Sequence, residues 1–373
     1  MSPTLADRLG ALPAMDVAGR VDRLRALLAE EGVDALLVTA LTNVRYLTGF
    51  TGSAGLVVVS ADELVLVTDG RYTEQAADQL ASAGVPGRLE ITGTEQRRIV
   101  TEAVADAGRI GLEADHVSWA AQRRYAREWF ADRDLVPTSG LVEQLRRTKD
   151  VGELARMEAA AAVADAALAE LRPTLLDGPT EAEFALELDA TMRRLGATKP
   201  SFETIVASGP NAARPHARPS GRRVAPGDLV VLDFGAVVDG YCSDMTRTVA
   251  VGAVDATSAR MLEVVTAAQA AGVAAVRPGV AAVDVDAACR AVIAEAGWAD
   301  AFTHGTGHGV GLDIHEAPRV GTTSDATLAV GDVVTVEPGV YLPARGGVRV
   351  EDTVVVTPEG CRPLTHSTKD PAP

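Results

Sequence analysis

The sequence predicts a two-domain protein, in which an α/β domain is followed by a second domain that ends in strands. The chain has 373 residues, whereas a single domain usually spans roughly 100–200 residues. Short apolar runs alternate with helical periods up to about residue 145, which is typical of an α/β domain. Beyond that point the pattern changes to long helices and to strands that are interrupted by polar residues.

In the first half of the chain, the spacing of apolar residues predicts strands and helices in alternation. Leu24, Leu27 and Leu28 recur with Val21 on one face of a helix expected over residues 20–31. The other expected elements are strands at 34–40, 55–60, 63–68 and 109–113, and helices at 72–84, 95–107 and 118–131.

The second half opens with an Ala-rich helix expected over residues 150–172. The D-G-P sequence at 177–179 breaks the chain. Thr180 and Glu183 then form a T-x-x-E capping box for the next helix. The remaining expected elements are helices at 180–195, 256–275 and 284–296, strands around them, and a tail from about residue 366.

Charge and composition exclude several classes of protein. The chain carries 35 basic and 51 acidic residues, a net charge of −16, which argues against a general nucleic-acid-binding protein. No apolar run approaches the ~18 residues of a membrane span, and the first residues lack the apolar core of a secretory signal. Three scattered cysteines form neither a disulfide framework nor a zinc-finger spacing. We therefore expect a cytoplasmic protein that binds neither nucleic acid nor membrane.

Two aspartates interrupt the apolar strands of the segment LVVLDFGAVVDGYCSDMTRTVAV (229–251). Asp239-Gly240 is typical of a hairpin turn, and Asp233 and Asp244 lie on its two arms. We expect them nearly opposite each other, where two carboxylates repel unless a cation lies between them. This pair alone leaves open the alternative of one aspartate in a turn and one on a solvated face.

A second carboxylate pair repeats this arrangement. In VVTVEPGVYLPARGGVRVEDTVVV (333–356), Glu337 and Glu351 lie within apolar runs, and the midpoint between them, residue 344, falls inside the P-A-R-G-G loop. A hairpin would again bring two carboxylates face to face. Two such pairs favour a metal site, because buried charges are usually paired or bound to metal.

Histidines cluster in HGTGHGVGLDIHE (304–316), which contains His304, His308 and His315. The segment lacks the G-x-G-x-x-G of a nucleotide loop and the H-E-x-x-H of a zinc helix. Glycine at every second position predicts a backbone packed against something bulky, such as a metal cluster or substrate. A fourth histidine, His216, lies between two prolines in a loop that we expect to be rigid.

The candidate ligands are four carboxylates and one imidazole, contributed by Asp233, Asp244, His308, Glu337 and Glu351. Such oxygen-rich ligands favour hard or borderline divalent ions, manganese first. Four carboxylates carry too much charge for one divalent ion, so two ions fit better. Paired ions serve hydrolysis, because they lower the pKa of a shared water and stabilise a tetrahedral intermediate.

The ligand motifs LDFG, SDMTRT, HGTGHGVGLDIHE, VEPGVY and GVRVEDT, in this order, resemble the pita-bread metallopeptidases of family M24. Within that family, PHARP and the N-terminal α/β domain are similar to the Xaa-Pro peptidases, prolidase and aminopeptidase P. NVRYLTGFTGSAG (43–55) resembles the start of their creatinase-like N-terminal domain, and RRTKDVGELARM (146–157) resembles the linker and first catalytic helix. The resemblance covers almost the whole chain.

This resemblance implies a creatinase-like α/β domain at 1–146 and an α+β pita-bread catalytic domain at 147–373. It also implies hydrolysis of the bond between an N-terminal residue and proline by a hydroxide that bridges two divalent metals. Asp233 would bind one metal, and Asp244 and Glu351 would bridge both. His308 and Glu337 would complete the second metal's ligands.

The resemblance also implies roles for neighbouring residues. His216 would donate a hydrogen bond to the developing oxyanion, and His304 and His315 would contact the substrate and assist proton transfer. Glu337, or a neighbouring carboxylate, would carry a proton to the proline nitrogen. Arg349, two residues before Glu351 on the same strand face, would orient the acidic cluster. Tyr341 is expected to be a core aromatic residue rather than part of that layer.

The implied cofactors and partners follow the same family. Two divalent ions are expected, with Mn²⁺ as the first candidate, and Co²⁺, Zn²⁺ and Fe²⁺ also tolerate such ligands. The implied substrates are small peptides with proline at the second position, and the implied assembly is a homodimer.

Several alternatives remain open at this point. The sequence does not separate a dipeptidase from an aminopeptidase P. Creatinase-like hydrolysis of a C–N bond without metal, and a non-enzymatic binding module, both conflict with five intact ligand positions. Methionine aminopeptidase is disfavoured by the additional N-terminal domain.

Overall fold

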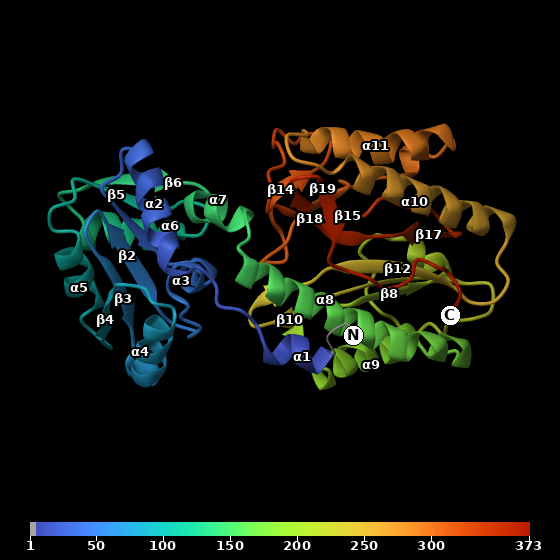
Figure 1. Ribbon diagram of the computed structural model, residues 1–373, viewed down its shortest axis with the longest axis horizontal. Coiled ribbons are helices and arrows are strands. Elements are labelled where there is room, and N and C mark those ends of the chain that lie inside the picture. The colour runs from blue at the N-terminus through green and yellow to red at the C-terminus, as the bar shows by residue number, and fades with distance from the viewer. Residues whose placement is uncertain (1–4) are drawn as a thin grey trace. The chain divides into compact units, whose positions relative to one another are not determined.

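The structure is a computed structural model that describes residues 5–373, which separate into two compact units (Figure 1). One unit spans Ala14–Arg146, and the other comprises Arg147–Pro373 together with residues 5–13. The N-terminal helix α1 (Leu5–Gly10) thus belongs to the second unit, although its position in the sequence suggested the first. The reason is apolar contact, because Leu5 and Leu9 pack against the second unit's core.

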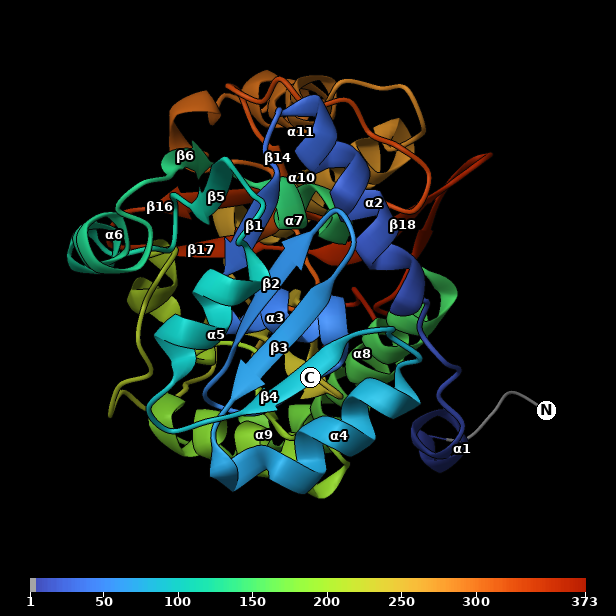
Figure 2. The same ribbon diagram turned by 90° about the vertical axis from the view of Figure 1, so that its left-hand side faces the viewer.

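The first unit is built on a six-stranded mixed sheet with the order β4-β3-β2-β1-β5-β6. Strand β1 pairs antiparallel with β2 and parallel with β5, and β2, β3 and β4 lie side by side beyond it (Figure 2). The strands are β1 (Ala35–Val38), β2 (Leu56–Ser60), β3 (Leu64–Thr68), β4 (Arg88–Ile91), β5 (Arg109–Glu113) and β6 (Asp134–Thr138). The four predicted strands are therefore present, and β4 and β6 are additional.

Helices cover this sheet, and two of them were not predicted. They are α2 (Ala18–Glu30), α3 (Leu41–Thr48), α4 (Thr73–Ser82), α5 (Gln96–Ala103), α6 (Trp119–Arg124) and α7 (Leu141–Arg147), with a 3₁₀ turn at Gly70–Tyr72 and a π-turn at Tyr125–Trp129. Helices α3 and α7 are the unpredicted ones. The start of α3 depends on a distant residue, since the Glu113 carboxylate accepts the N–H groups of Thr39 and Ala40 at 2.6 and 2.9 Å.

The helices of the second unit follow the predicted pattern closely. They are α8 (Val151–Leu171), α9 (Glu181–Arg194), α10 (Ala256–Ala275) and α11 (Ala282–Glu295), with 3₁₀ turns at Arg172–Asp177, Gly209–Ala213 and Ala299–Ala301. The predicted capping box between Thr180 and Glu183 is confirmed, and Asp150 forms a second one with Glu153 at the start of α8. No helix within residues 5–373 combines the length and apolar character needed to cross a membrane.

Strands fill the space between two pairs of helices in the second unit (Figure 1). Helices α8 and α9 pack on the side formed by β8 to β12, and α10 and α11 pack on the side that contains β15 to β18. The strands are β7 (Lys199–Pro200), β8 (Ile205–Ser208), β9 (Leu229–Phe234), β10 (Ala236–Val238), β11 (Tyr241–Cys242), β12 (Met245–Ala250), β13 (Gly307–Gly309), β14 (Glu316–Val320), β15 (Val333–Val336), β16 (Gly339–Leu342), β17 (Gly346–Arg349), β18 (Asp352–Thr357) and β19 (Gly360–Pro363). This α+β arrangement matches the predicted fold class.

The C-terminal segment is anchored, so the prediction of a tail from residue 366 is wrong. The Asp165 carboxylate accepts the N–H groups of His366 and Ser367, both at 2.8 Å. Further along, the carbonyl of Pro371 accepts the N–H of Ala250 at 2.8 Å. These contacts come from backbone groups, which hydropathy does not reveal.

Candidate metal centre

Three carboxylates from three different strand ends meet inside the second unit. Asp233 lies near the end of β9, Asp244 directly before β12, and Glu351 directly before β18. Each offers one oxygen, and these oxygens all lie within 4.8 Å of one another. The structure therefore brings together three of the five predicted ligands in one cluster.

The first hairpin differs in register from the prediction. Asp233 lies opposite Thr246 rather than opposite Asp244. Asp244 is two positions away, and because the side-chain period of a strand is two, both carboxylates still point to the same face. The pairing is broken at Gly235, where a Cβ would lie 1.9 Å from the Ser243 carbonyl oxygen.

The second hairpin has the predicted register. Val336 pairs with Asp352, and Gly339 pairs with Arg349. Glu337 and Glu351 occupy the corresponding positions just outside these strand pairs. The two glutamates therefore face each other across the hairpin.

His308 completes the cluster from strand β13. Its Nε2 lies 3.5 Å from Asp244 Oδ2 and 3.5 Å from Glu337 Oε1. Its Nδ1 lies 2.9 Å from the carbonyl oxygen of Gly309, which can only accept. Nδ1 therefore carries the proton, and Nε2 presents its lone pair to the carboxylates and to a metal ion.

The glycines beside His308 allow close contact between neighbouring strands. A Cβ on Gly307 would lie 2.0 Å from the Thr335 carbonyl oxygen, and one on Gly309 would lie 2.1 Å from the carbonyl oxygen of Ala317. The missing side chains therefore let the backbone at these glycines pack closely against the neighbouring strands β15 and β14.

Burial makes this acidic cluster electrostatically unfavourable without a cation. Removal from water, reinforced by the neighbouring carboxylates, raises the pKa of Asp244 and of Glu351 well above the ordinary range. Burial raises the pKa of Glu337 to about 8 and lowers the pKa of His308 to about 4. A bound divalent cation would lower the carboxylate pKa values again and favour their ionised forms, whereas the neutral imidazole of His308 is already the form that binds a metal.

The residues present fit a divalent metal ion. Glu351 Oε2 accepts a hydrogen bond from the Thr246 hydroxyl at 2.7 Å, whereas Glu351 Oε1 is buried and has no hydrogen-bond partner within residues 5–373. A buried carboxylate oxygen without a donor is costly unless a cation contacts it. Carboxylates with one imidazole are ligands that suit several divalent ions, so they do not select one.

Arg349 links the acidic cluster to a second layer of polar groups. Its Nη2 lies 2.5 Å from Asp233 Oδ2, and its Nε donates to the Thr246 hydroxyl at 3.1 Å. A similar support reaches Glu337, whose Oε1 accepts the Thr335 hydroxyl at 3.2 Å. The two threonines were not predicted, although Thr335 precedes Glu337 by two residues, as Arg349 precedes Glu351.

Tyr341 and His304 belong to this layer. The Tyr341 oxygen accepts from Arg349 Nη1 at 2.8 Å and lies 2.9 Å from His304 Nε2. His304 Nδ1 lies 2.7 Å from the Gly305 carbonyl oxygen, so Nδ1 is the donor and Nε2 accepts the Tyr341 hydroxyl. Tyr341 is therefore more than the expected core aromatic residue. Both ring nitrogens of His304 bind the protein itself, whereas the resemblance implied substrate contact.

His315 and His216 are both exposed, and His315 contacts the ligand candidate His308. The His315 ring centroid is 4.4 Å from that of His308 in an edge-to-face arrangement. His216 is exposed, and the carbonyl oxygen of the preceding Pro215 accepts from Arg349 Nη1 at 3.3 Å. Burial lowers the pKa of His315, and the positive charges of Arg319 and His216 add to this effect.

A buried ion pair holds the segment that carries His315. Lys149 Nζ lies 3.1 Å from Glu316 Oε2, and the side chains are 1% and 6% exposed. Glu316 Oε1 accepts the N–H of Asp313 at 3.1 Å. The residue next to His315 is thus fixed to the start of the second unit.

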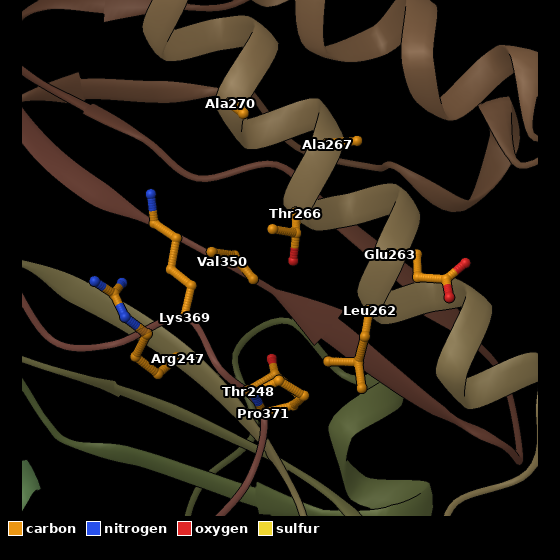
Figure 3. A pocket seen from close by; sticks show the side chains of 10 residues that line it. All are labelled: Arg247, Thr248, Leu262, Glu263, Thr266, Ala267, Ala270, Val350, Lys369 and Pro371. Carbon is orange, nitrogen blue, oxygen red and sulfur yellow. The ribbon is translucent and has the colours of Figure 1, made fainter.

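A separate pocket is lined by Val350, which lies between Arg349 and Glu351 in the sequence. Its volume is about 490 Å³, and the side chains of Val350, Thr248 and Leu262 line it together with helix α10 (Figure 3). Two of the charged residues that line it, Arg247 and Lys369, both contact Asp352, at 2.8 and 2.5 Å.

Models of two known protein families match this chain, one in each unit. The model for "Metallopeptidase family M24" matches residues 155–358, and the model for "Creatinase/Prolidase N-terminal domain" matches residues 20–148. An uncharacterised peptidase of Bacillus subtilis, YqhT, is 43% identical over 353 residues, which cover 94% of this chain and 99% of the relative.

Solved structures show the same fold. A structure described as Xaa-Pro dipeptidase from Bacillus anthracis has a TM-score of 0.92 and 39% identity, and covers 95% of this chain and 99% of its own. The X-Pro aminopeptidase from Thermotoga maritima has a TM-score of 0.86 and 34% identity, and covers 94% of this chain and 99% of its own. The similarity therefore extends over both units.

Proposed function

Because this chain belongs to metallopeptidase family M24, we propose that it hydrolyses the peptide bond between an N-terminal residue and a following proline. The observation that carries the proposal is the buried cluster of Asp233, Asp244 and Glu351 beside His308 and Glu337. The similar structures named Xaa-Pro dipeptidase and X-Pro aminopeptidase support the choice of substrate.

The five clustered side chains would bind two divalent ions, with Mn²⁺ as the first candidate. Asp244 and Glu351 would bridge the ions, Asp233 would bind one of them, and His308 with Glu337 would bind the other. When bound, the ions supply the Lewis acidity that activates water at neutral pH and stabilises the tetrahedral intermediate.

The chain's own residues would orient the substrate and move the proton. His216, exposed on its loop, would donate to the carbonyl oxygen as negative charge develops there. Glu337, or a neighbouring carboxylate, would carry a proton to the proline nitrogen. Arg349 would hold Asp233 through its 2.5 Å contact, and His315 would contact the substrate beside His308.

Proline requires such a dedicated site for a chemical reason. An Xaa-Pro bond has no N–H, and the proline ring fixes φ. Peptidases that bind an extended backbone by its N–H groups therefore lose a contact at this bond. A site that acts through metal ions and side-chain donors does not depend on that N–H.

The proposal also includes the bounds of the two domains and the oligomeric state of the protein. Residues 147–373 would be the catalytic domain, because they contain every candidate ligand, and residues 1–146 the N-terminal domain. A homodimer in the cytoplasm remains a prediction.

The test is hydrolysis of Ala-Pro and Ala-Pro-Ala by the purified protein loaded with Mn²⁺, with Ala-Ala as the proline-free control and a chelated sample. Cleavage of Ala-Pro alone would make the protein a dipeptidase. Cleavage of the tripeptide after its first residue would make it an aminopeptidase P. Failure to cleave either peptide with two ions bound would refute the proposed substrate class.

A further inference from the structure

Glu181 holds both ends of the loop that carries His216. It is the first residue of helix α9 and is fully buried. Its Oε1 accepts the backbone N–H and the hydroxyl of Ser208, both at 2.7 Å. Its Oε2 accepts the backbone N–H of Ser220 at 3.0 Å and the Ser220 hydroxyl at 2.5 Å. One carboxylate thus joins the two ends of residues 208–220, here called the His216 loop.

A third residue adds to this anchor. Asn211 Nδ2 lies 3.0 Å from Glu181 Oε1 and 3.1 Å from Glu181 Oε2. Burial alone would raise the pKa of Glu181, but the hydrogen bonds from Ser220, Ser208 and Asn211 outweigh it and lower the pKa. The carboxylate is therefore ionised and accepts strong, charge-assisted hydrogen bonds.

The opposite side of the His216 loop lies against the strand of the acidic cluster. A Cβ on Gly347 in β17 would lie 2.2 Å from the carbonyl oxygen of Ala212. At the end of the same strand, Arg349 donates to the carbonyl of Pro215. The loop is therefore confined between the start of α9 and β17, with His216 next to the Arg349 contact.

We propose that Glu181 is a positioning residue, which fixes the His216 loop so that His216 meets the carbonyl oxygen of the substrate. This inference rests on the proposed function. Glu181 touches neither the acidic cluster nor the substrate in this assignment, and acts only through His216.

The substitution Glu181→Gln tests the anchor with little change of volume. Glutamine keeps one acceptor oxygen but places an NH₂ group where the second oxygen accepted donors. The backbone N–H of either Ser208 or Ser220 would then face this NH₂ group instead of an acceptor oxygen. One end of the His216 loop would therefore detach. A displacement of about 1 Å costs up to roughly 10²-fold in rate.

The experiment is a double-mutant cycle with Glu181→Gln and His216→Ala, measured as kcat and KM for Ala-Pro, with metal content. In the wild-type background, Glu181→Gln should lower kcat by roughly 10- to 100-fold with metal retained. In the His216→Ala background it should have little further effect, because the group it positions is absent. Glu187→Gln, on the exposed face of the same helix, is the matched control and should leave kcat unchanged.

Equal losses of kcat in both backgrounds, or no loss in the wild-type background, would overturn the inference. Absence of Ala-Pro cleavage by the wild-type protein would refute the proposed function instead, so the two failures are distinguishable.

A second variant and a second measurement cover the case in which Glu181→Gln fails to fold. Ser220→Ala removes one hydroxyl donor and should give a smaller fall in kcat in the same direction. Hydrogen exchange of peptides over residues 205–222 should be faster in either variant than in the wild type. Unchanged exchange and unchanged kcat in a folded variant would contradict the anchor.

Discussion

The two carboxylate oxygens of Glu351 have different neighbours, because Oε2 accepts the Thr246 hydroxyl at 2.7 Å, whereas Oε1 is buried without a hydrogen-bond partner among residues 5–373. Alternation within VRVEDT indicated an inward carboxylate with Arg349 on the same face. The hydroxyl that Glu351 Oε2 accepts comes from Thr246, 105 residues away. Nothing within the segment indicates such a contact, because it depends on which hairpins pack together.

Asp244→Ala should abolish hydrolysis of Ala-Pro and lower the amount of bound metal. The reason is that Asp244 contributes an oxygen to the cluster and lies 3.5 Å from His308 Nε2. Metal content by mass spectrometry and the rate of hydrolysis would be measured together. Asp239→Asn, in the turn of the same hairpin, is the control and should keep both. Full activity of a metal-free Asp244→Ala protein would refute the two-metal assignment.

His216→Ala should lower kcat by about 10²–10³-fold, as expected for the loss of one oxyanion donor. Metal content should not change, because His216 lies on an exposed loop outside the acidic cluster. Steady-state kinetics with parallel metal analysis would check this. If the variant instead lost its metal, His216 would be a ligand and its assignment would be wrong.

Elements that depend on local periodicity were predictable, and those that depend on distant contacts were not. The periodicity over residues 256–275 predicted α10 with the observed bounds. Helix α3 has only eight residues, and the Glu113 carboxylate holds the N–H groups of Thr39 and Ala40 directly before it, so its own sequence carried too little of the information. The alternation of glycines around His308 is visible in the sequence. Its cause, the close contact of the backbone with β15 and β14, depends on which strands are neighbours in the sheet.

Gly307→Ala should destabilise the strand that carries His308. The new Cβ would lie 2.0 Å from the Thr335 carbonyl oxygen, which is backbone and cannot rotate away. Overpacking of this kind typically costs about 1–3 kcal/mol, and the displaced His308 should bind metal less tightly. Gly321→Ala, whose Cβ would meet only Gly305 at 3.6 Å, is the control. Equal denaturation midpoints for both variants would contradict the account.

The change of pattern between the two halves of the chain was visible in the sequence, whereas the contacts of its two ends were not. The change of pattern near residue 145 lies close to the division that the structure makes after Arg146. Helix α1 packs on the core of the second unit, and the segment expected to be a tail is held by the Asp165 carboxylate, which accepts the N–H of His366, and by the N–H of Ala250, which donates to Pro371. Both depend on contacts with residues far away in the chain.

The metal-free protein should lose stability as pH rises from about 6.5 to 8. Burial raises the pKa of Glu337 from 4.5 to about 8, so the folded state binds more protons than the unfolded state in that window, and a rise in pH favours unfolding. The raised pKa values of Asp244 and Glu351 act in the same direction. His304 and His308 act oppositely, but only between about 4 and 6.5.

Thermal unfolding of chelated protein at several pH values would measure this effect. The Tm should fall above about pH 6.5 in chelated samples, whereas Mn²⁺ should raise the Tm and remove the slope. A chelated protein whose Tm rises across this window would show that the acidic cluster does not control its stability.

The two hairpins also limit which insertions and deletions the sequence can accept. The turn at Asp239-Gly240 and the turn between β16 and β17 set which residues face the cluster. Insertion or deletion of a single residue in either turn would move every following side chain to the opposite face of its strand. Evolution can therefore exchange the amino acids of these turns, but a change in their length separates the paired acids. Among divergent descendants, the spacing between the paired acids should persist after the turn sequences themselves have changed.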